Sequence, residues 1–408
     1  MDTRLAPRFD NDSAAQEAQK LLRSCVHCGF CTATCPTYQL LGDELDGPRG
    51  RIYLIRQLLE SGRTSRQART HLDRCLLCRS CETTCPSGVE YSRLLHIGRH
   101  LSQEVLPLPL GQRLLRAGLR GILPHPKRVR LLLRLGRWTR PFLPASLRRR
   151  LPRRSSRGKL PRKTHERKVL LFQGCVQSAA ARNINAATRR VLDRLGIQCL
   201  ELSRQQCCGA VHHHLGADEQ AREQARRNID SWLPRLQQGA EVLLVTASAC
   251  ALEIREYPLL FTNDPAYRQK AVELLQHCQE IGTFLSHEDI GRIRLHGTPP
   301  LAFHAPCTLQ HGLGSADSTR ELLSRLGFDL REPADRHLCC GAAGTYSILQ
   351  PQLADRLGRD KLEKLQETGA ANIASANIGC LLHLQERTEQ PVRHWIEWLD
   401  ELLAREDS

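Results

Sequence analysis

Long apolar runs are absent from this sequence of 408 residues, and so are the glycine motifs of common nucleotide-binding sites. No stretch of 18 or more apolar residues occurs, and the polar N-terminus holds no apolar signal core, so we expect neither a transmembrane helix nor a secretory signal. No Walker loop occurs, and residues 312–317 begin a dinucleotide turn without completing it. We therefore expect no flavin (FAD) or nicotinamide site on this chain itself.

Aromatic side chains make up only 4% of the residues, and the most basic part of the chain has few of them. Between Gln112 and Lys168 there are 20 Lys or Arg and one acid, Glu166, whereas the remainder carries 39 basic and 42 acidic residues. With one Trp and one Phe, this stretch lacks platforms for stacking bases, so no nucleic acid is expected as a partner. Residues 106–167 are predicted to form a basic, Pro-rich linker.

Cysteines are abundant, and eight of the 18 form two copies of the motif C-x-x-C-x-x-C-x-x-x-C-P, with an offset of 50 positions. Two-cluster ferredoxins have this motif: three thiolates of a run bind one cubane, and the cysteine before proline binds the other. The sequence therefore predicts two [4Fe–4S] clusters with crossed ligation. One cluster is expected on Cys25, Cys28, Cys31 and Cys85, and the other on Cys75, Cys78, Cys81 and Cys35.

Zinc tetrathiolate sites and a disulfide framework are the alternatives. Zinc sites usually separate two C-x-x-C pairs by a longer stretch, and disulfide frameworks are typical of short secreted chains. Both alternatives explain the doubled motif less well than iron–sulfur clusters do.

The sequence between the two runs is helical in its pattern. Residues 49–62 place Ile52, Ile55 and Leu59 at helical spacing, and the gap between the runs leaves room for a helix pair. Residues 14–105 are therefore predicted to form a mostly helical twin [4Fe–4S] ferredoxin-type domain.

A second set of cysteines marks an internal duplication. In each copy, a predicted strand ends at a cysteine, an amphipathic helix and a Cys-Cys-Gly turn follow, and a second predicted strand ends at the last cysteine. The first three cysteines recur after 132 positions and the last after 130. The first copy has Cys175, Cys207, Cys208 and Cys250, and the second has Cys307, Cys339, Cys340 and Cys380.

The duplication predicts two α/β domains with parallel sheets, residues 168–290 and 291–408, and hence the fold class α+α/β for the chain. Because open α/β sheets place their sites beyond the carboxyl ends of strands, the eight duplicated cysteines are candidates for a further redox site. Buried thiols that only pack beside a turn glycine are the alternative. Cys199 and Cys278 have no counterparts and are expected to be inert.

Two polar clusters are expected to be ordinary surface. His212, His213 and His214 follow the first Cys-Cys-Gly turn and are expected in a polar surface loop. The acids of residues 43–46 are expected in a solvated turn. No catalytic residue is expected on this chain.

The motifs together resemble the iron–sulfur subunit of bacterial glycolate oxidase (glycolate dehydrogenase). The resemblance extends from about residue 18 to the end and rests on blocks that include CVHCGFCTATCPTYQLLGDELDGPRGRIYLIRQLLE, HLDRCLLCRSCETTCPSGV, CCGAVHHHLGA and RNIDSW. The duplicated half is similar to the CCG domains of heterodisulfide reductase B-type subunits, which can hold an unusual cluster. That pattern ends in C-x-x-C, but Ala247 and Asn377 stand here where a cysteine is expected. A simpler cluster, a thiol site or a quinone-facing pocket stays open for this half.

The resemblance implies an electron-transfer subunit of a multisubunit oxidoreductase. Flavin-bearing partner subunits would oxidise glycolate to glyoxylate, and this chain would relay the electrons towards a membrane quinone. The corresponding subunit for lactate or glycerol 3-phosphate is the alternative, since the cysteine motifs cannot choose between substrates.

The basic linker also predicts where the protein is attached in the cell. In residues 127–140, Leu131, Leu132, Leu135 and Trp138 share one helical face and most arginines lie on the other. A basic amphipathic helix with Trp at its apolar edge suits a lipid headgroup boundary. We therefore expect peripheral attachment to the cytoplasmic face of the membrane, with a solvated linker or docking to an acidic partner as alternatives.

Overall fold

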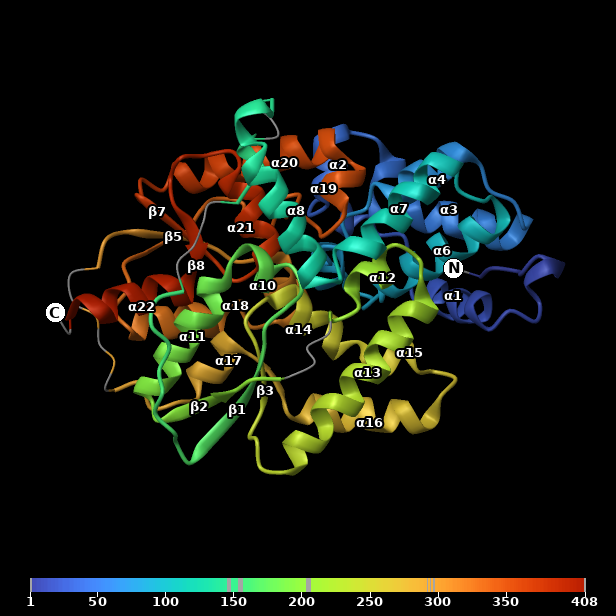
Figure 1. The fold of residues 1–408 in the computed structure, drawn as a ribbon. Helices are drawn as coiled ribbons and strands as arrows, with labels where there is room; N and C mark the ends of the chain where they lie inside the picture. Colours follow the sequence, from blue (N-terminus) through green and yellow to red (C-terminus); the bar gives the residue numbers. More distant parts are fainter. Residues whose placement is uncertain are drawn as a thin grey trace. The chain divides into compact units, whose positions relative to one another are not determined.

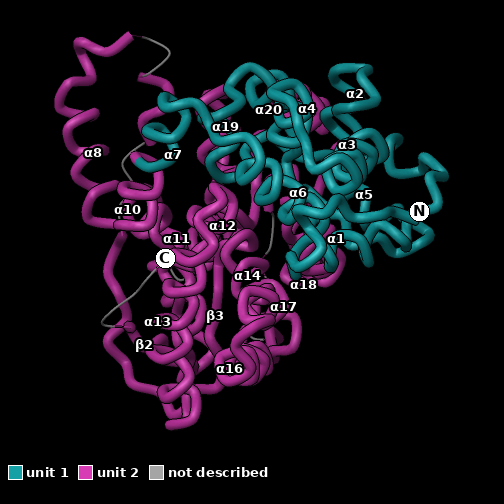
Figure 2. The backbone as a smooth tube through the Cα atoms, turned by 90° about the vertical axis from the view of Figure 1, so that its right-hand side faces the viewer, with its two compact units in different colours: residues 1–117, 337–357 teal, residues 118–336, 358–408 magenta. Residues whose placement is uncertain are grey.

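The computed structural model describes residues 2–144, 148–152, 157–202, 207–291, 293, 295 and 298–406. The chain forms two compact units, and each is built from two stretches of sequence (Figure 2). Unit 1 comprises Met1–Ala117 and His337–Leu357, and unit 2 comprises Gly118–Arg336 and Gly358–Ser408. The predicted linker 106–167 includes residues 145–147 and 153–156, and the second predicted α/β domain includes 292, 294, 296, 297 and 407–408; these residues lie outside the described ranges.

Among its described residues, unit 1 has helices joined by loops and no strand, which confirms the mostly helical N-terminal domain. Short 3-10 helices, η1 to η3, occupy Pro7–Phe9, Phe30–Thr32 and Glu44–Asp46. Its α-helices are α1 (Ser13–Arg23), α2 (Pro36–Leu41), α3 (Pro48–Ser61), α4 (Arg66–Asp73), α5 (Ser80–Thr84), α6 (Tyr91–Val105) and α19 (Tyr346–Leu349). Two further helices, α7 (Leu110–Ile122) and α20 (Pro351–Gln366), run across the boundary between the units.

Helix α3 confirms the helical pattern predicted between the cysteine runs. It begins at Pro48, whose fixed φ suits the first helical position, and it ends before Gly62, which has φ +65°. Its apolar face is buried, with Ile55 fully enclosed. A Cβ at Gly98 of α6 would lie 2.6 Å from Cγ1 of Ile55, so glycine permits the close contact between α3 and α6.

Two four-stranded parallel sheets form the duplicated half, as the sequence predicts (Figure 1). The first has the order β2-β1-β3-β4 and the second the order β6-β5-β7-β8, so the copies share one topology. The strands of the first sheet are β1 (Arg167–Phe172), β2 (Ile197–Leu200), β3 (Leu243–Val245) and β4 (Cys278–Glu280). Those of the second are β5 (Leu301–His304), β6 (Leu330–Arg331), β7 (Asn372–Ser375) and β8 (Val392–His394).

Helices connect these strands, because parallel neighbours need crossover connections. Those of the first copy are α10 (Gln177–Ala180), α11 (Arg182–Arg194), α12 (Ala210–His214), α13 (Asp218–Gln237), α14 (Ser248–Arg255), α15 (Tyr257–Leu260), α16 (Pro265–Gln276) and α17 (Ile281–Ser286). Those of the second are the π-helix η5 (Thr308–Leu313), α18 (Ala316–Arg325), α20, α21 (Ile378–Gln385) and α22 (Trp395–Glu406). The basic stretch before them holds α8 (Pro126–Trp138) and η4 (Arg140–Phe142).

The strand order creates a gap for a site at the same place in each sheet. From β1 the chain moves outward to β2 and then returns to the opposite side of β1 to form β3. The connections after β1 and β3 therefore leave in opposite directions, which is the topological switch point where open α/β sheets bind ligands. The equivalent point of the second sheet lies between β5 and β7.

All four strands predicted to end at a cysteine stop short of it. Strands β1 and β5 stop at Phe172 and His304, three residues before Cys175 and Cys307. The segments predicted to run as strands to Cys250 and Cys380 stop at Val245 and Ser375, and both cysteines lie in the first turn of a helix, α14 or α21. Residues after Ser248 are mostly good helix formers. The apolar pattern alone predicts a longer strand, because it cannot show where tertiary packing ends the strand.

No helix of the described part of the chain combines the length and the apolar character needed to cross a membrane.

Candidate functional site

The two ferredoxin-type cysteine runs fold into loops of the same shape. His27 and Gly29 have φ values of +57° and +85°, and their counterparts Leu77 and Arg79 have +54° and +64°. A positive φ is strained for a residue with a Cβ, so its recurrence at matched positions marks a backbone that the site requires. The left-handed residues alternate with the cysteines and curl each loop around one centre.

The first loop borders a cavity with about 460 Å³ of empty space. The cysteines that line it include the four predicted for the first cluster, with the fourth contributed by the other run: Cys25, Cys28, Cys31 and Cys85. Burial, followed by the charge of Cys25, raises the pKa of Cys31 to about 11. Thiolates this close repel one another unless a cationic centre holds them, and soft sulfur ligands suit iron.

The second loop borders a cavity with about 350 Å³ of empty space, open solvent included, and a cysteine of the other run again lies on its wall. The cysteines on its wall are Cys35, Cys75, Cys78 and Cys81, the set predicted for the second cluster. Cys81 also borders the first cavity. Burial, and then the charge of Cys78, raises the pKa of the Cys81 thiol. The donor sets of both cavities therefore fit iron–sulfur clusters.

The surroundings of the two cavities differ. Cys28 is exposed beside the first, and its neighbours Val26 and Phe30 are 68% and 61% exposed. Arg51, which is fully buried, lines the second and donates from Nε to the carbonyl of His71 at 2.7 Å. Burial lowers the pKa of Arg51, but the charge of Cys75 and other neighbours outweighs it and raises the pKa overall. The second cavity thus has a buried cation in its wall, whereas the first has an exposed cation, Arg49, and an open edge.

Asp46 corrects the expectation of a solvated turn. Its carboxylate is buried, accepts from Arg74 at 2.8 Å and from Arg51 at 3.5 Å, and lies 3.1 Å from Nδ1 of His71. A buried carboxylate needs such partners, because an unpaired charge is costly inside a protein. Asp46 therefore positions Arg51 beside the second cavity, a role that its turn-like sequence does not reveal.

The four cysteines of the first repeat gather at the switch point between β1 and β3. Sγ of Cys175 lies 3.5 Å from Sγ of Cys207. Cys208 hydrogen-bonds through its side chain to both Cys207 and Cys250. The bond to Cys175 lowers the pKa of Cys207, and the same bond raises the pKa of Cys175. One member of this buried group is thus favoured as a thiolate, which is the form that binds metals.

Buried polar groups behind these cysteines hold the Cys-Cys-Gly turn. Asn228 of α13 donates from Nδ2 to the carbonyl of Cys207 at 2.8 Å, and the Tyr257 hydroxyl donates to the carbonyl of Cys208 at 2.7 Å. Both side chains are fully buried. Sequence reasoning did not single out either residue, although Asn228 lies in the block RNIDSW that contributes to the resemblance.

His213 corrects the expectation of a polar surface loop. Residues 210–214 form the short helix α12, and Nδ1 of His213 lies 3.1 Å from Oε1 of Glu253, which is 3% exposed. Burial lowers the pKa of His213, but the charge and hydrogen bond of Glu253, with other nearby acids, together outweigh burial and raise the pKa to about 9. The histidine is an ion-pair partner of α14, the helix that carries Cys250.

The second repeat has the same turn as the first. Gly341 has φ +86° and donates from its backbone N–H to Sγ of Cys339 at 3.4 Å, as Gly209, with φ +102°, does to Cys207 at 3.5 Å. Cys339 and Cys340 are buried in the stretch of unit 1 that ends at Leu357.

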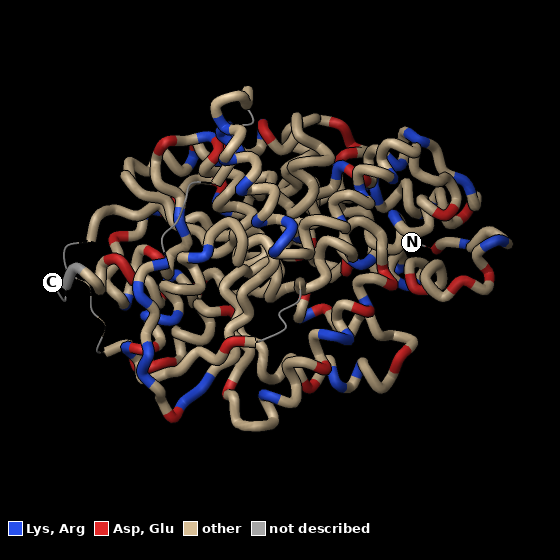
Figure 3. Tube along the Cα trace, viewed as in Figure 1, with Lys and Arg blue, Asp and Glu red and all other residues tan. Residues whose placement is uncertain are grey.

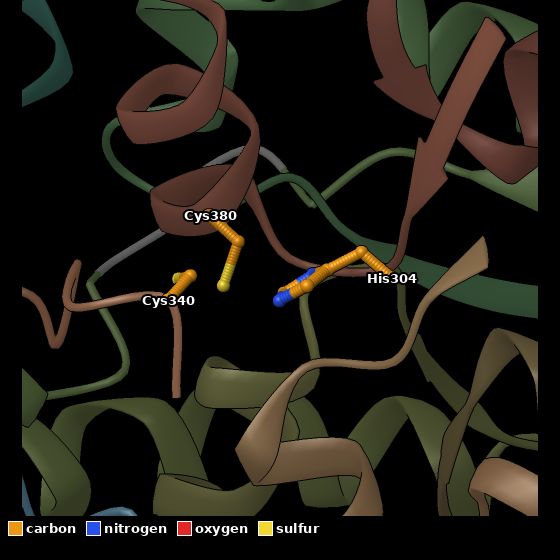
Figure 4. A group of neighbouring side chains, drawn as sticks. All are labelled: His304, Cys340 and Cys380. Carbon is orange, nitrogen blue, oxygen red and sulfur yellow. The ribbon is translucent and has the colours of Figure 1, made fainter. Parts of the chain in front are cut away.

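Cys307 and Cys380 of the second repeat lie in unit 2, on the segments that follow β5 and β7. Sγ of Cys380 accepts from Nδ2 of Asn377 at 3.5 Å. His304, at the end of β5, extends towards Cys380 (Figure 4), and a ring nitrogen lies within 4.8 Å of that sulfur.

The two cysteines without counterparts lie on edge strands. Cys199 is in β2 and Cys278 is in β4, and burial raises the pKa of each to about 12. Protonated thiols on outer strands fit the expectation that both are inert.

Models of two protein families match the chain. A 4Fe-4S dicluster domain matches residues 21–89, and a cysteine-rich domain matches residues 169–255 and again 301–385. These matches support two [4Fe–4S] clusters in the N-terminal part and confirm the duplication. The chain is thus an iron–sulfur protein that joins a dicluster domain to two cysteine-rich domains.

Curated relatives narrow that class. The glycolate oxidase iron-sulfur subunit of Escherichia coli (strain K12) is 47% identical over 407 residues, which is 100% of both chains. The probable glycolate oxidase iron-sulfur subunit of Bacillus subtilis (strain 168) is 27% identical, over 89% of this chain and 88% of its own. Lactate utilization protein A of B. subtilis is 31% identical over 225 residues, 54% of this chain and 91% of its own. The chain belongs to the family of glycolate oxidase iron–sulfur subunits.

Proposed function

We propose that this chain relays single electrons within a glycolate oxidase complex. Partner subunits that carry FAD would oxidise glycolate to glyoxylate, and this chain would pass the electrons towards a membrane quinone. The observation that carries the proposal is the pair of cavities, each lined by one predicted ligand set. When bound there, [4Fe–4S] clusters supply reversible one-electron chemistry.

An assay of the reconstituted complex tests the relay. The chain alone should not oxidise glycolate, and the flavin-bearing subunits alone should not reduce quinone. Together they should do so under anaerobic conditions. Complete glycolate-to-quinone turnover by the flavin subunits without this chain would overturn the proposal.

Crossed ligation gives the cysteines their roles. Cys25, Cys28, Cys31 and Cys85 would hold the first cluster, and Cys75, Cys78, Cys81 and Cys35 the second. The lining of the two cavities supports this assignment. Cys85→Ser should alter the EPR signal of the cluster beside the exposed loop, and the matched variant Cys35→Ser should alter the other. If each variant instead disturbs the cluster of its own run, the ligation is not crossed.

The duplicated cysteines would form one or two further redox sites. The short contacts among Cys175, Cys207, Cys208 and Cys250 support a thiolate site in the first repeat. The second site would use Cys307, Cys339, Cys340 and Cys380 by the same pattern. Each site has four thiolates, which fits a simple iron–sulfur cluster.

Tyr346 supports a route from the ferredoxin-type part to the second repeat. Burial raises the pKa of Tyr346, and the charges of Cys75 and Cys339 raise it further. Its hydroxyl donates to the carbonyl of Arg74 at 3.1 Å. We expect electrons to pass from the second [4Fe–4S] cluster towards Cys339 along this side of unit 1.

Four segments would share this work: the twin-cluster domain 14–105, the linker 106–167, and the cysteine-rich repeats 168–290 and 291–408. The ranges matched by the family models lie inside the first, third and fourth segments. Limited proteolysis of the complex should cut first within 106–167, and first cuts inside a repeat would contradict the division.

Helix α8 supports peripheral attachment to the cytoplasmic face of the membrane. Its residues Leu131, Leu132, Leu135 and Trp138 are 56%, 49%, 48% and 81% exposed. Lys and Arg residues are interspersed among the apolar residues along this helix (Figure 3). Each cation near an anionic leaflet contributes roughly 1 kcal/mol, so several together would hold the protein there.

Vesicle co-sedimentation tests the attachment. The double variant Leu131→Ser and Leu135→Ser should bind anionic vesicles less than the wild type. Leu259→Ser, which removes an exposed leucine elsewhere in unit 2, is the matched control. If the double variant binds anionic vesicles as well as the Leu259→Ser control does, α8 is not the anchor. If the wild type binds neither anionic nor neutral vesicles, docking to an acidic protein is favoured instead.

Lactate is the second candidate substrate of the partner subunits, because a lactate utilization protein matches about half of this chain. The full-length match to a glycolate oxidase subunit favours glycolate. Comparing glycolate with lactate as electron donors to the reconstituted complex decides between them.

A further inference from the structure

His304 presents its two ring nitrogens to different surroundings. Nδ1 lies 2.9 Å from Oγ of Ser375, the last residue of β7, and both side chains are buried. Nε2 is also buried but has no hydrogen-bond partner among the described residues. A buried polar atom left unpaired costs free energy, so an imidazole kept in this state calls for an explanation.

The duplication shows that the fold does not need an imidazole here. His304 ends β5 as Phe172 ends β1, 132 positions earlier. Phe172 packs edge-to-face on Trp232, with ring centroids 5.5 Å apart, and completes an apolar core. The second repeat therefore has a polar ring at the position where the first repeat has a hydrophobic one.

The unpartnered nitrogen lies at the switch point of the second sheet. His304 is the last residue of β5, the strand beside β7, and a nitrogen of its ring lies within 4.8 Å of Sγ of Cys380 (Figure 4). Two donor atoms at this separation can bind the same iron–sulfur cluster. Cys307, three residues after His304, is another member of the proposed thiolate set.

We infer that Nε2 of His304 is a nitrogen ligand of the iron–sulfur centre that the second repeat holds. The inference rests on the proposed function, which places a centre on the duplicated cysteines. The first repeat would then hold its centre with thiolates alone, and the second with thiolates and one imidazole. The extra donor stands in for the thiolate that the sequence lacks at Asn377.

Ser375 prepares His304 for this role. If Nδ1 carries the proton and donates to Oγ of Ser375, Nε2 keeps its lone pair for the metal. Metal-bound histidines commonly donate their other N–H in this manner, which fixes both the tautomer and the ring orientation. Ser375 is accordingly a positioning residue for His304.

Neutral imidazole and anionic thiolate affect a cluster differently. Replacing thiolate by histidine raises the reduction potential, because the ligand set is less negative. The exchange His304→Cys should therefore lower the midpoint potential of the centre in the second repeat. The N–H of Asn377 that faces Sγ of Cys380 withdraws charge in the same direction as the imidazole.

Pulsed EPR of the anaerobically purified complex tests the ligand directly. One reduced centre of the wild type should show strong coupling to nitrogen, and growth on ¹⁵N-histidine should convert the coupling to that of ¹⁵N. His304→Phe, which copies the first repeat, should abolish it. His287→Gln, at an exposed histidine, should leave it unchanged. Coupling that persists in His304→Phe would overturn the inference.

Two further measurements keep the outcomes distinct. If His304→Phe fails to hold the centre, His304→Cys should hold it without nitrogen coupling and at a lower potential; an unchanged potential would count against ligation. Iron analysis separates this inference from the proposed function. Iron equal to that of two [4Fe–4S] clusters would sink both the proposed centre on the duplicated cysteines and the inference about His304, and it would leave the relay through the two clusters standing. Extra iron without nitrogen coupling would sink the inference about His304 alone.

Discussion

The two α/β repeats keep one framework and differ at the ends of their strands. Both sheets have the same strand order, and both Cys-Cys-Gly turns direct a glycine N–H at the first sulfur. The last residues of equivalent strands nevertheless differ: Phe172 corresponds to His304, and Glu280 corresponds to His394. Duplication has thus preserved the strand order and the Cys-Cys-Gly turn, while the residues at the ends of the strands have diverged in polarity.

The difference teaches that the two repeats are not interchangeable sites. In the first repeat, the strand-end residues are the apolar Phe172 and the buried acid Glu280. In the second, buried imidazoles occupy the corresponding positions. We expect the repeats to respond differently to ligand loss and to pH.

The largest effect should come from removing one thiolate from each repeat in turn. Cys207→Ser and Cys339→Ser should each lower the iron content and abolish the signal of one extra centre, while the two [4Fe–4S] signals remain. Iron and sulfide analysis with EPR measures this. Unchanged iron and normal turnover in both variants would return the duplicated cysteines to a packing role and break the comparison.

Glu280 should make the first repeat sensitive to rising pH. Burial raises its pKa to about 8, although its carboxylate accepts from the N–H of Gly282 at 2.7 Å. The stability that the neutral acid provides is complete below pH 4.5 and is lost as pH rises through about 8, by about 1.4 kcal/mol per unit of pKa shift. Glu280→Gln should flatten the fall in unfolding free energy across this window.

Denaturant titrations at several pH values measure the effect of Glu280. Glu288→Gln, which changes a nearby carboxylate paired with Arg167, is the control. An equally steep loss in the Glu280→Gln variant would show that another group is responsible.

His394 should make the second repeat sensitive to falling pH. Burial lowers its pKa to about 4; Nε2–H donates to the carbonyl of Thr246 at 2.8 Å, and Nδ1 accepts from the N–H of Ile396 at 3.2 Å. The stability of the neutral ring is complete above pH 6.5 and is lost as pH falls through about 4. In thermal melts, His394→Gln should reduce the acid-induced loss, even though it lowers stability at pH 7.

The smallest effect on stability should come from the buried polar side chains that hold the Cys-Cys-Gly turn of the first repeat. Tyr257→Phe removes the hydrogen bond to the carbonyl of Cys208 and leaves Asn228 with one partner fewer. A cost of about 1–3 kcal/mol is expected for the buried groups left unpaired. Tyr267→Phe, whose hydroxyl bonds exposed Asp230, is the control and should change the unfolding free energy much less. Equal effects would argue against a special role for Tyr257.

Sequence reasoning succeeded where chemistry or repetition is encoded locally. The doubled cysteine run and the 132-residue offset predicted the two-cluster domain and the two parallel sheets, because both depend on spacing along the chain. It failed for Asp46, whose burial depends on Arg51, Arg74 and His71. The pairing of His213 with Glu253 was missed for the same reason: contacts between distant residues leave no local pattern.

The division of the chain between the units has a consequence for its synthesis. Unit 1 needs residues 337–357, which are translated after most of unit 2. A nascent chain that has reached residue 336 carries both ferredoxin-type runs but lacks Tyr346, whose hydroxyl bonds the carbonyl of Arg74 next to Cys75. Maturation of the N-terminal part should therefore finish late, and a fragment cut at residue 117 should be an incomplete donor for transplanting the two clusters into another protein.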